Sequence, residues 1–204
     1  LLPIMKKSLD LLYDGKPVRF LDINDQEKHV IRNLQLLTSK PVLYVCNVDE
    51  NSAAKGNEYS ESVSKIASAE NAGTVIISAQ IESELAQLED EEKDEYLGEL
   101  GVLEPGLNRL INAGYDLLDL MTYFTAGPKE TRAWTVPIGS TAPRAAREIH
   151  TDFENGFIRA EVISYEDYVN LGGEQKCKEA GKMRVEGKDY LVKDGDVIYF
   201  RFNI

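Results

Sequence analysis

The stretch that decides the fold is Pro41-Val42-Leu43-Tyr44-Val45-Cys46-Asn47-Val48-Asp49-Glu50. Its apolar first part predicts a buried strand, and its polar end predicts a turn where that strand stops. Asn47 carries a donor and an acceptor and Glu50 a carboxylate, so this turn can hydrogen-bond a polar ligand. We interpret Asn47, Val48 and Glu50 as candidate binding residues, and the resemblance described below implies that their ligand is a nucleotide base. The alternative is an ordinary strand-end turn with a solvated Glu.

A second apolar run, Thr74-Val75-Ile76-Ile77, ends at Ser78-Ala79, 31 positions after Asn47. A helical stretch, residues 59–71, lies between the two runs, and Gly73 is placed to supply the left-handed residue that often ends a helix. Strand, helix and strand at this spacing predict a βαβ crossover, which binds ligands at the carboxyl ends of its strands. Ser78 and Ala79 are therefore expected at the same edge as Asn47, and the resemblance described next implies that they also contact the base.

This pair of turns resembles the base-recognition turns of P-loop GTPases, whose usual form is Asn-Lys-x-Asp followed, one strand later, by Ser-Ala. In those proteins the Asp carboxylate accepts from two guanine N–H donors, the Lys stem covers the base and the Ser-Ala turn brings a backbone N–H. Here Val48 replaces the Lys, and Glu50 moves the carboxylate by about one methylene. The resemblance therefore implies weakened guanine preference and tolerance of adenine.

The phosphate-binding half of such a site is missing from the sequence. No Gly-x-x-x-x-Gly-Lys-Ser/Thr motif occurs, and Gly181-Lys182 has Lys176 and Met183 where the motif requires Gly and Ser or Thr. The Mg²⁺ ligands that accompany ATP or GTP are likewise expected outside this chain. We expect a C-terminal fragment of a larger nucleotide-binding protein, with no hydrolytic activity of its own.

Composition favours a reduced, cytoplasmic protein. Cys46 and Cys177 lack the spacing of a zinc site or redox pair, and no apolar run approaches the length of a transmembrane helix. The net charge of −12 is uneven: residues 1–126 hold 11 Lys or Arg and 22 Asp or Glu, whereas residues 127–204 hold 12 and 13. This shift predicts a domain boundary near residue 120.

Further elements follow from local patterns. Asn24 and Glu27 predict a capping box that opens a helix through Leu37. Additional helices are expected at 81–88, 91–100 and 105–120. Beyond Thr122 we expect strands at 123–126, 133–138, 157–164, 190–192 and 197–202, a helix from 141 to about 150 and short helical pieces at 166–171 and 174–180. This order predicts a β-grasp, ubiquitin-like fold.

Six segments together resemble the YchF/Obg-like ATPase family, within the TRAFAC class of P-loop GTPases. They are residues 47–50, 104–109, 123–136, 149–159, 179–184 and 186–196. The resemblance implies an α/β fold, in which the C-terminal part of a P-loop NTPase domain (βαβ plus helices) precedes a β-grasp TGS domain. It divides the chain into the end of a helical arm and its return helix (1–40), the NTPase part (41–118) and the TGS domain (119–204).

The resemblance also implies association with ribosomes or nucleic acid. Six cations are candidates for a surface that contacts RNA or the ribosome, because phosphate binding requires clustered positive charge. They are Arg144, Arg147, Lys176, Lys178, Lys182 and Arg184. Since this domain is nearly neutral and the residues come from separate segments, the alternative is a solvated surface without a ligand.

Three functional hypotheses follow. The preferred one is that the parent protein is an ATP- or GTP-hydrolysing switch that associates with the ribosome or nucleic acid. The second is a TGS-type module that docks RNA, ribosome or protein and has no hydrolytic role. The third, an accessory region like those of tRNA synthetases or stringent factors, is disfavoured by the Asn47–Glu50 turn. We also expect self-association through the unpaired edge of strand 42–46.

Overall fold

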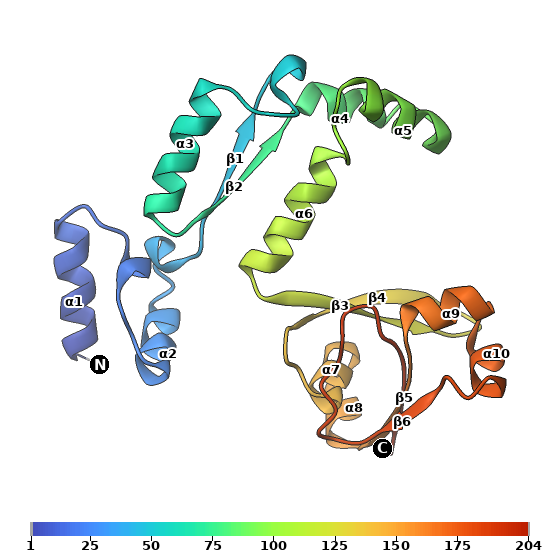
Figure 1. Ribbon diagram of the computed structural model, residues 1–204. Coiled ribbons are helices and arrows are strands. Elements are labelled where there is room, and N and C mark those ends of the chain that lie inside the picture. Colours follow the sequence, from blue (N-terminus) through green and yellow to red (C-terminus); the bar gives the residue numbers. More distant parts are fainter. Residues whose placement is uncertain (1, 204) are drawn as a thin grey trace. The chain divides into compact units, whose positions relative to one another are not determined.

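The computed structural model describes residues 2–203 and divides into two compact units, which meet in sequence between Leu117 and Leu118. Figure 1 labels their helices and strands. No helix within residues 2–203 is both long enough and apolar enough to cross a membrane.

The first unit opens with four helical elements around a small core of Ile4, Val18 and Ile31. They are α1 (Leu2–Tyr13), the 3₁₀ turn η1 (Val18–Phe20), α2 (Asp25–Leu34) and the 3₁₀ turn η2 (Leu37–Ser39). The capping box at Asn24 and Glu27 forms as expected. The prediction that α2 reaches Leu37 is wrong, because Gln35 takes a left-handed conformation (φ 50°) that ends the helix.

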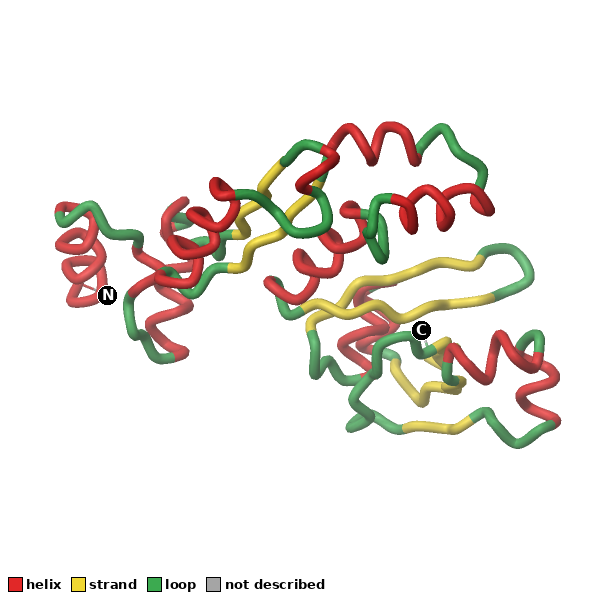
Figure 2. Tube along the Cα trace, turned by 45° about the horizontal axis from the view of Figure 1, so that its top comes forward, coloured by secondary structure: helices red, strands yellow, loops and turns green. Residues whose placement is uncertain are grey.

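A βαβ crossover follows. Its elements are β1 (Leu43–Asn47), the 3₁₀ turn η3 (Glu50–Ser52), α3 (Glu58–Ala69) and β2 (Gly73–Ile77), after which come α4 (Ala79–Leu85), α5 (Asp90–Glu99) and α6 (Gly106–Leu117). The two strands are parallel and in register from Leu43 opposite Gly73 to Asn47 opposite Ile77. Figures 1 and 2 show them side by side. This arrangement confirms the α/β fold class.

The end of α3 corrects one prediction. Asn71, and not Gly73, is the left-handed residue after the helix (φ 53°), and the Ala72 N–H donates to the Ala67 carbonyl at 2.8 Å, as in a Schellman motif. Gly73 instead begins β2, where an added Cβ would lie 2.9 Å from Leu43 Cδ1. A side chain at this position would therefore have to displace the end of the Leu43 side chain.

The second unit is a β-grasp fold. Its elements are β3 (Leu120–Ala126), β4 (Thr131–Pro137), α7 (Ala142–Ile149), α8 (Thr151–Asn155), β5 (Phe157–Ile163), α9 (Tyr165–Leu171), α10 (Glu174–Glu179), β6 (Arg184–Glu186) and β7 (Val197–Phe202). The sheet order is β4-β3-β7-β5-β6, with β3 and β7 parallel. The alanines of α7 are buried, and the Ala145 carbonyl accepts from the Tyr123 hydroxyl at 2.9 Å.

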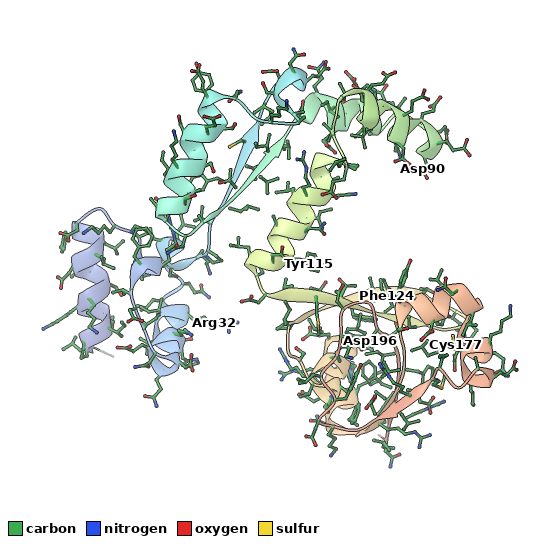
Figure 3. All side chains as sticks on the ribbon, viewed as in Figure 1. Arg32, Asp90, Tyr115, Phe124, Cys177 and Asp196 are labelled. Carbon is green, nitrogen blue, oxygen red and sulfur yellow. The ribbon has the colours of Figure 1, made fainter. Side chains whose placement is uncertain are left out.

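The expected strand at 190–192 is wrong. This segment makes only an isolated bridge between Leu191 and Thr141, because its backbone bonds the turn before α7: the Tyr190 carbonyl accepts from Ala142 N–H and the Val192 N–H donates to Ser140. The Tyr190 hydroxyl donates to the buried Asp196 carboxylate at 2.7 Å, and Figure 3 labels Asp196 within this unit. Strand β6, at 184–186, was not expected.

Candidate functional site

The parallel pairing of β1 and β2 brings the two candidate base-binding turns together. Asn47 is the last residue of β1 and stands opposite Ile77, the last residue of β2. The ladder continues one step further, since the Val48 N–H donates to the Ile77 carbonyl at 2.9 Å. Ser78 and Ala79 follow Ile77 directly, so Asn47, Val48, Ser78 and Ala79 share the carboxyl edge of this sheet.

The Asn47 side chain has a fixed orientation. Its Oδ1 accepts a hydrogen bond from the Ala79 N–H at 2.9 Å, which identifies the oxygen and leaves the Nδ2 amino group as a donor. A carbonyl oxygen has two lone pairs, so Oδ1 retains capacity for a second donor. Asn47 is exposed, so its amide is open to a ligand. The Ala79 N–H, expected to face the base, is engaged by Asn47.

The two acids of this turn have different roles. The Asp49 carboxylate accepts from the Ser52 N–H at 3.1 Å and also bonds the Ser52 hydroxyl, so Asp49 caps η3. Glu50 is the first residue of η3 and is half-buried. No side-chain hydrogen bond or ion pair of Glu50 is recorded within residues 2–203, so its carboxylate has capacity for a ligand.

Tyr96 of α5 lies near Glu50. A hydrogen bond to Glu84 of α4, together with desolvation and the charges of Glu84, Glu50 and Glu99, raises the pKa of Tyr96 to about 12. The charge of Glu50 is therefore one of the causes that raise the pKa of Tyr96, the residue that links α5 to α4. Sequence reasoning missed Tyr96, because it is 46 positions from Glu50 and no local pattern links them.

Ser78 is buried, and its hydroxyl is one of three buried side-chain polar atoms without a hydrogen-bond partner in the part of the chain that the structure describes. Ser78 occupies the N-cap position of α4, yet its side chain does not cap the helix. An unsatisfied buried hydroxyl costs about 1–3 kcal/mol. The Ser78 hydroxyl lies at the edge of the sheet that Asn47 shares.

Gly106 lets α6 pack against the end of β2. Its N–H donates to the Glu82 carboxylate of α4 at 2.7 Å. A Cβ at this position would lie 3.0 Å from Glu82 Oε1 and 3.1 Å from Ile77 Cγ2, so only glycine fits without displacement. Gly106 belongs to the 104–109 segment, which the sequence analysis used only for the resemblance. This segment thus packs against Ile77, the residue before Ser78.

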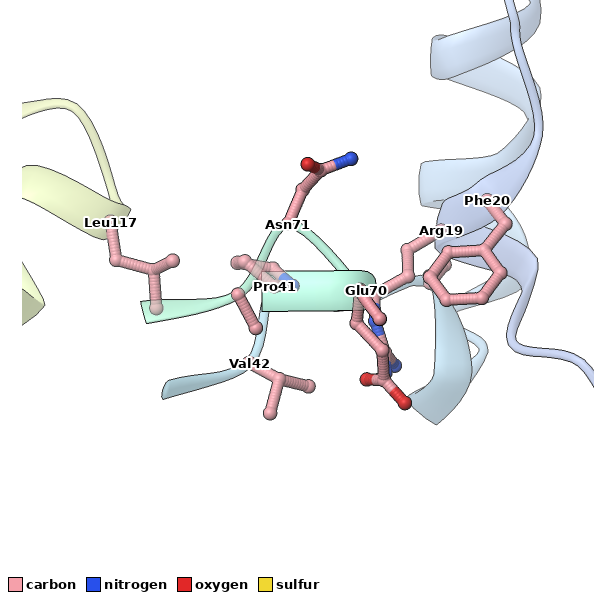
Figure 4. Close-up of a pocket in the computed structure, with 10 residues that line it drawn as sticks. Arg19, Phe20, Pro41, Val42, Glu70, Asn71 and Leu117 are labelled. Atoms are coloured by element: carbon pink, nitrogen blue, oxygen red, sulfur yellow. The ribbon is translucent and has the colours of Figure 1, made fainter. Parts of the chain in front are cut away.

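A cavity of about 510 Å³ lies near the opposite, amino end of the strands (Figure 4). Arg19 of η1 donates to Glu70, which follows α3, at 2.7 Å, and the Tyr44 hydroxyl bonds the same carboxylate at 3.2 Å. Arg19 and Glu70 line this cavity beside Pro41 and Val42. The ion pair ties the N-terminal helical segment to the crossover, away from the candidate base site.

The structure does not gather the six predicted RNA-contacting cations on one element. Arg144 and Arg147 lie on α7, where they pair with Glu148 and Glu154 at 3.5 and 3.4 Å. Figures 1 and 2 show the α7–α8 pair and the α9–α10 pair on different sides of the unit.

The other four cations lie after α9. Lys182 pairs with Asp167 at 3.2 Å, and Arg184 lies 3.5 Å from Glu186 and 3.6 Å from Asp196. Hydrogen bonds from Ser164 and then Lys182 hold the pKa of Asp167 below its usual value. Lys176 and Lys178 of α10 are exposed, and no carboxylate partner is recorded for either within residues 2–203.

The residues present do not fit a magnesium ion. Within residues 2–203, no group of three or more His, Cys, Asp or Glu side chains is arranged to hold a metal.

Comparison with known proteins covers both units. A family model described as "YchF-GTPase_C: Protein of unknown function (DUF933)" matches residues 120–203, the β-grasp unit. The "Ribosome-binding ATPase YchF" of Escherichia coli O157:H7 is 54% identical over 203 residues, covering 100% of this chain and 56% of the relative. The protein of the same name from Bacillus subtilis (strain 168) is 50% identical over 203 residues, covering 98% and 56%.

The architecture also has a solved counterpart, the YchF GTPase of Schizosaccharomyces pombe. It matches with a TM-score of 0.81 and 32% identity, over 98% of this chain and 53% of that one. The chain thus spans about half the length of the curated relatives it matches. Across both units, this chain is similar in sequence and in architecture to the corresponding part of the YchF proteins.

Proposed function

We propose that this chain supplies the base-reading edge of an ATP- or GTP-hydrolysing P-loop switch protein, together with a β-grasp module of the TGS type. The observation that supports this most directly is the hydrogen bond between Asn47 Oδ1 and the Ala79 N–H. It holds an exposed amide at the carboxyl edge of a parallel sheet, where α/β folds bind their ligands.

The held amide suits adenine. An Asn side chain pairs with adenine through two bonds, donating from Nδ2 to a ring nitrogen and accepting at Oδ1 from the exocyclic amino group. Both capacities remain after the bond to Ala79, since Oδ1 has a second lone pair. Val48 adds apolar contact beside the base. Guanine would instead require a carboxylate at the spacing of Asp, which Glu50 does not provide.

We further propose that the parent protein works in the cytoplasm, binds nucleoside triphosphate with Mg²⁺ held by residues outside this chain, and associates with ribosomes. The curated relatives are called ribosome-binding ATPases, and that name is the support for the partner. Phosphoryl transfer needs a phosphate cradle and a metal ion, and this sequence contains no such cradle motif. Hydrolysis is therefore assigned to the parent protein.

The test is a nucleotide titration of the parent protein, with and without ribosomes, using Asn47→Ala and a control, Asn51→Ala. Asn51 lies in η3 and is exposed. Asn51→Ala therefore removes an amide side chain of the same kind from the same turn and leaves Asn47 in place. Asn47→Ala should weaken ATP binding about tenfold or more, as loss of a bidentate pair implies, and Asn51→Ala should not. Equal binding by both variants would exclude Asn47 from base recognition.

A further inference from the structure

The β-grasp unit contains an apolar groove of about 410 Å³ between its first hairpin, α8 and β7. Trp134 of β4, Phe153 of α8 and Phe202 of β7 line it, and the rings of Phe153 and Phe202 stack with centroids 3.7 Å apart. All three side chains are only partly buried. Partly exposed aromatic rings around a groove are typical of binding surfaces.

Trp134 is held in a defined position. Its indole Nε1–H donates to Thr125 Oγ1 at 2.9 Å, across the hairpin. The guanidinium of Arg132 lies over the indole ring, 4.1 Å from the ring centroid. The indole is therefore held in place, and the guanidinium that covers one of its faces provides hydrogen-bond donors at the same point of the groove.

The cations near this groove differ from four of the six cations predicted from sequence. Arg144, Arg147, Lys182 and Arg184 all have carboxylate partners. By contrast, no carboxylate partner is recorded in residues 2–203 for Lys129, which lines the groove, or for Arg132. Glu130 also lines the groove, so the β3–β4 turn and Arg132 together carry a net positive charge of one.

We propose that this groove binds a single-stranded segment of RNA, with a base against the aromatic wall and phosphates contacted by Lys129 and Arg132. The proposal rests on the proposed ribosome association, and it names the chemistry of that contact. Base stacking on aromatic rings beside cations is how single strands are held. An apolar peptide would also fill the groove, but it would leave both cations without an anion, and RNA is therefore favoured.

Trp134 provides the probe, because it is the one tryptophan in the sequence. The full chain is titrated with a mixed-sequence, single-stranded RNA of about 12 nucleotides, and intrinsic tryptophan emission is followed at several salt concentrations. Binding should quench the emission, and the affinity should fall as salt rises. A Lys129→Glu/Arg132→Glu variant should bind labelled RNA about tenfold or more weakly, with a smaller salt slope.

The matched control is Lys176→Glu/Lys178→Glu, which makes the same charge change at two exposed, unpaired cations of α10 in the same unit. It should bind RNA within about twofold of the unchanged chain. Equal weakening by both variants would overturn the proposal, because binding would then follow net charge alone. Absence of quenching with measurable RNA binding would also overturn it.

Ribosome co-sedimentation separates this inference from the proposed function. RNA binding that quenches Trp134, by a chain that does not pellet with ribosomes, would support the groove and contradict the ribosome partner. Pelleting that depends on Lys129 and Arg132 without any binding of RNA would identify a protein partner and overturn the RNA assignment. Thermal melts of each variant, followed by circular dichroism, show whether the fold is retained.

Discussion

At the scale of single residues, the proposed base recognition depends on how far the acidic side chain of the turn at residues 47–50 reaches. If Asn47, Val48 and Glu50 bind the base as we propose, the Glu50 carboxylate lies about one methylene beyond the position that meets two guanine N–H donors, and Val48 offers apolar contact without a Lys stem. A base donor left unpaired costs about 1–3 kcal/mol. The parent should therefore bind ATP at least as well as GTP.

The double substitution Val48→Lys with Glu50→Asp should move this preference toward GTP by about tenfold, as one unpaired donor implies. Competitive binding of the two nucleotides to the parent protein and to the variant measures the ratio. Val48→Lys alone is the control, because it adds the stem without moving the carboxylate. A ratio that stays the same in the double variant would mean that Glu50 does not read the base.

Gly106 gives a second residue-scale prediction. A methyl group at Gly106 would press on Ile77 and on the Glu82 carboxylate, so Gly106→Ala should lower the free energy of unfolding by about 1–3 kcal/mol. Gly114 lies in the same helix with open space around it, so Gly114→Ala should raise the free energy of unfolding by up to about 1 kcal/mol. Urea unfolding measures both. If the two changes have the same sign, the fit of Gly106 against β2 is not what restricts that position.

At the scale of elements, α4 and α5 are joined through Tyr96 and Glu84. The hydrogen bond, desolvation and nearby carboxylates raise the pKa of Tyr96 from 10 to about 12. The folded state therefore holds this proton more tightly than the unfolded state. The contribution to stability is complete below pH 10 and is lost as the pH rises toward 12.

Tyr96→Phe should remove this alkaline loss. The unchanged chain should lose more stability between pH 9 and pH 12 than the variant, as measured by chemical unfolding at each pH. Tyr59→Phe is the control, since the Tyr59 side chain is 74% exposed. Identical pH profiles for the Tyr96 and Tyr59 variants would contradict a role for the Tyr96–Glu84 bond.

Local patterns predicted most elements but not the contacts between distant segments. The capping box at Asn24 and the crossover from β1 to β2 were predictable, because capping and strand patterns are local. The left-handed residue fell on Asn71 because α3 ended two residues before the predicted end. The 190–192 segment has a strand-like composition, but its backbone hydrogen-bonds Ser140 and Ala142 at the start of α7. Tertiary contacts therefore override the local preference for a strand.

The proximity of the two candidate turns was predictable for a similar reason, and the side chains around them were not. The turns at Asn47 and Ser78 each follow a recognisable strand, and the parallel pairing brings their ends together. The proximity of Tyr96 to Glu50, the packing at Gly106 and the groove around Trp134 depend on side chains from separate elements. The pairing of Arg147 with Glu154 depends on tertiary placement in the same way.

At the scale of the whole molecule, the open edge of β1 predicts association of the chain as it stands. Within residues 2–203, β1 pairs with β2 alone, so its other edge offers unpaired backbone N–H and carbonyl groups. Val45, at the middle of β1, is 43% exposed. A sheet edge of this kind pairs readily with another strand, so β1 of one copy of the chain can pair with a strand of a second copy.

Sedimentation over a concentration series should therefore show dimers or larger species at high concentration. A charged residue on an edge strand opposes pairing, so Val45→Lys should shift the chain toward monomer. Val185→Lys is the matched control, because Val185 of β6 is also exposed but lies in the second unit. If Val185→Lys dissociates the assembly and Val45→Lys does not, association runs through the β-grasp unit and the edge of β1 is not its cause. Monomeric behaviour of the unchanged chain at every concentration would contradict the predicted association.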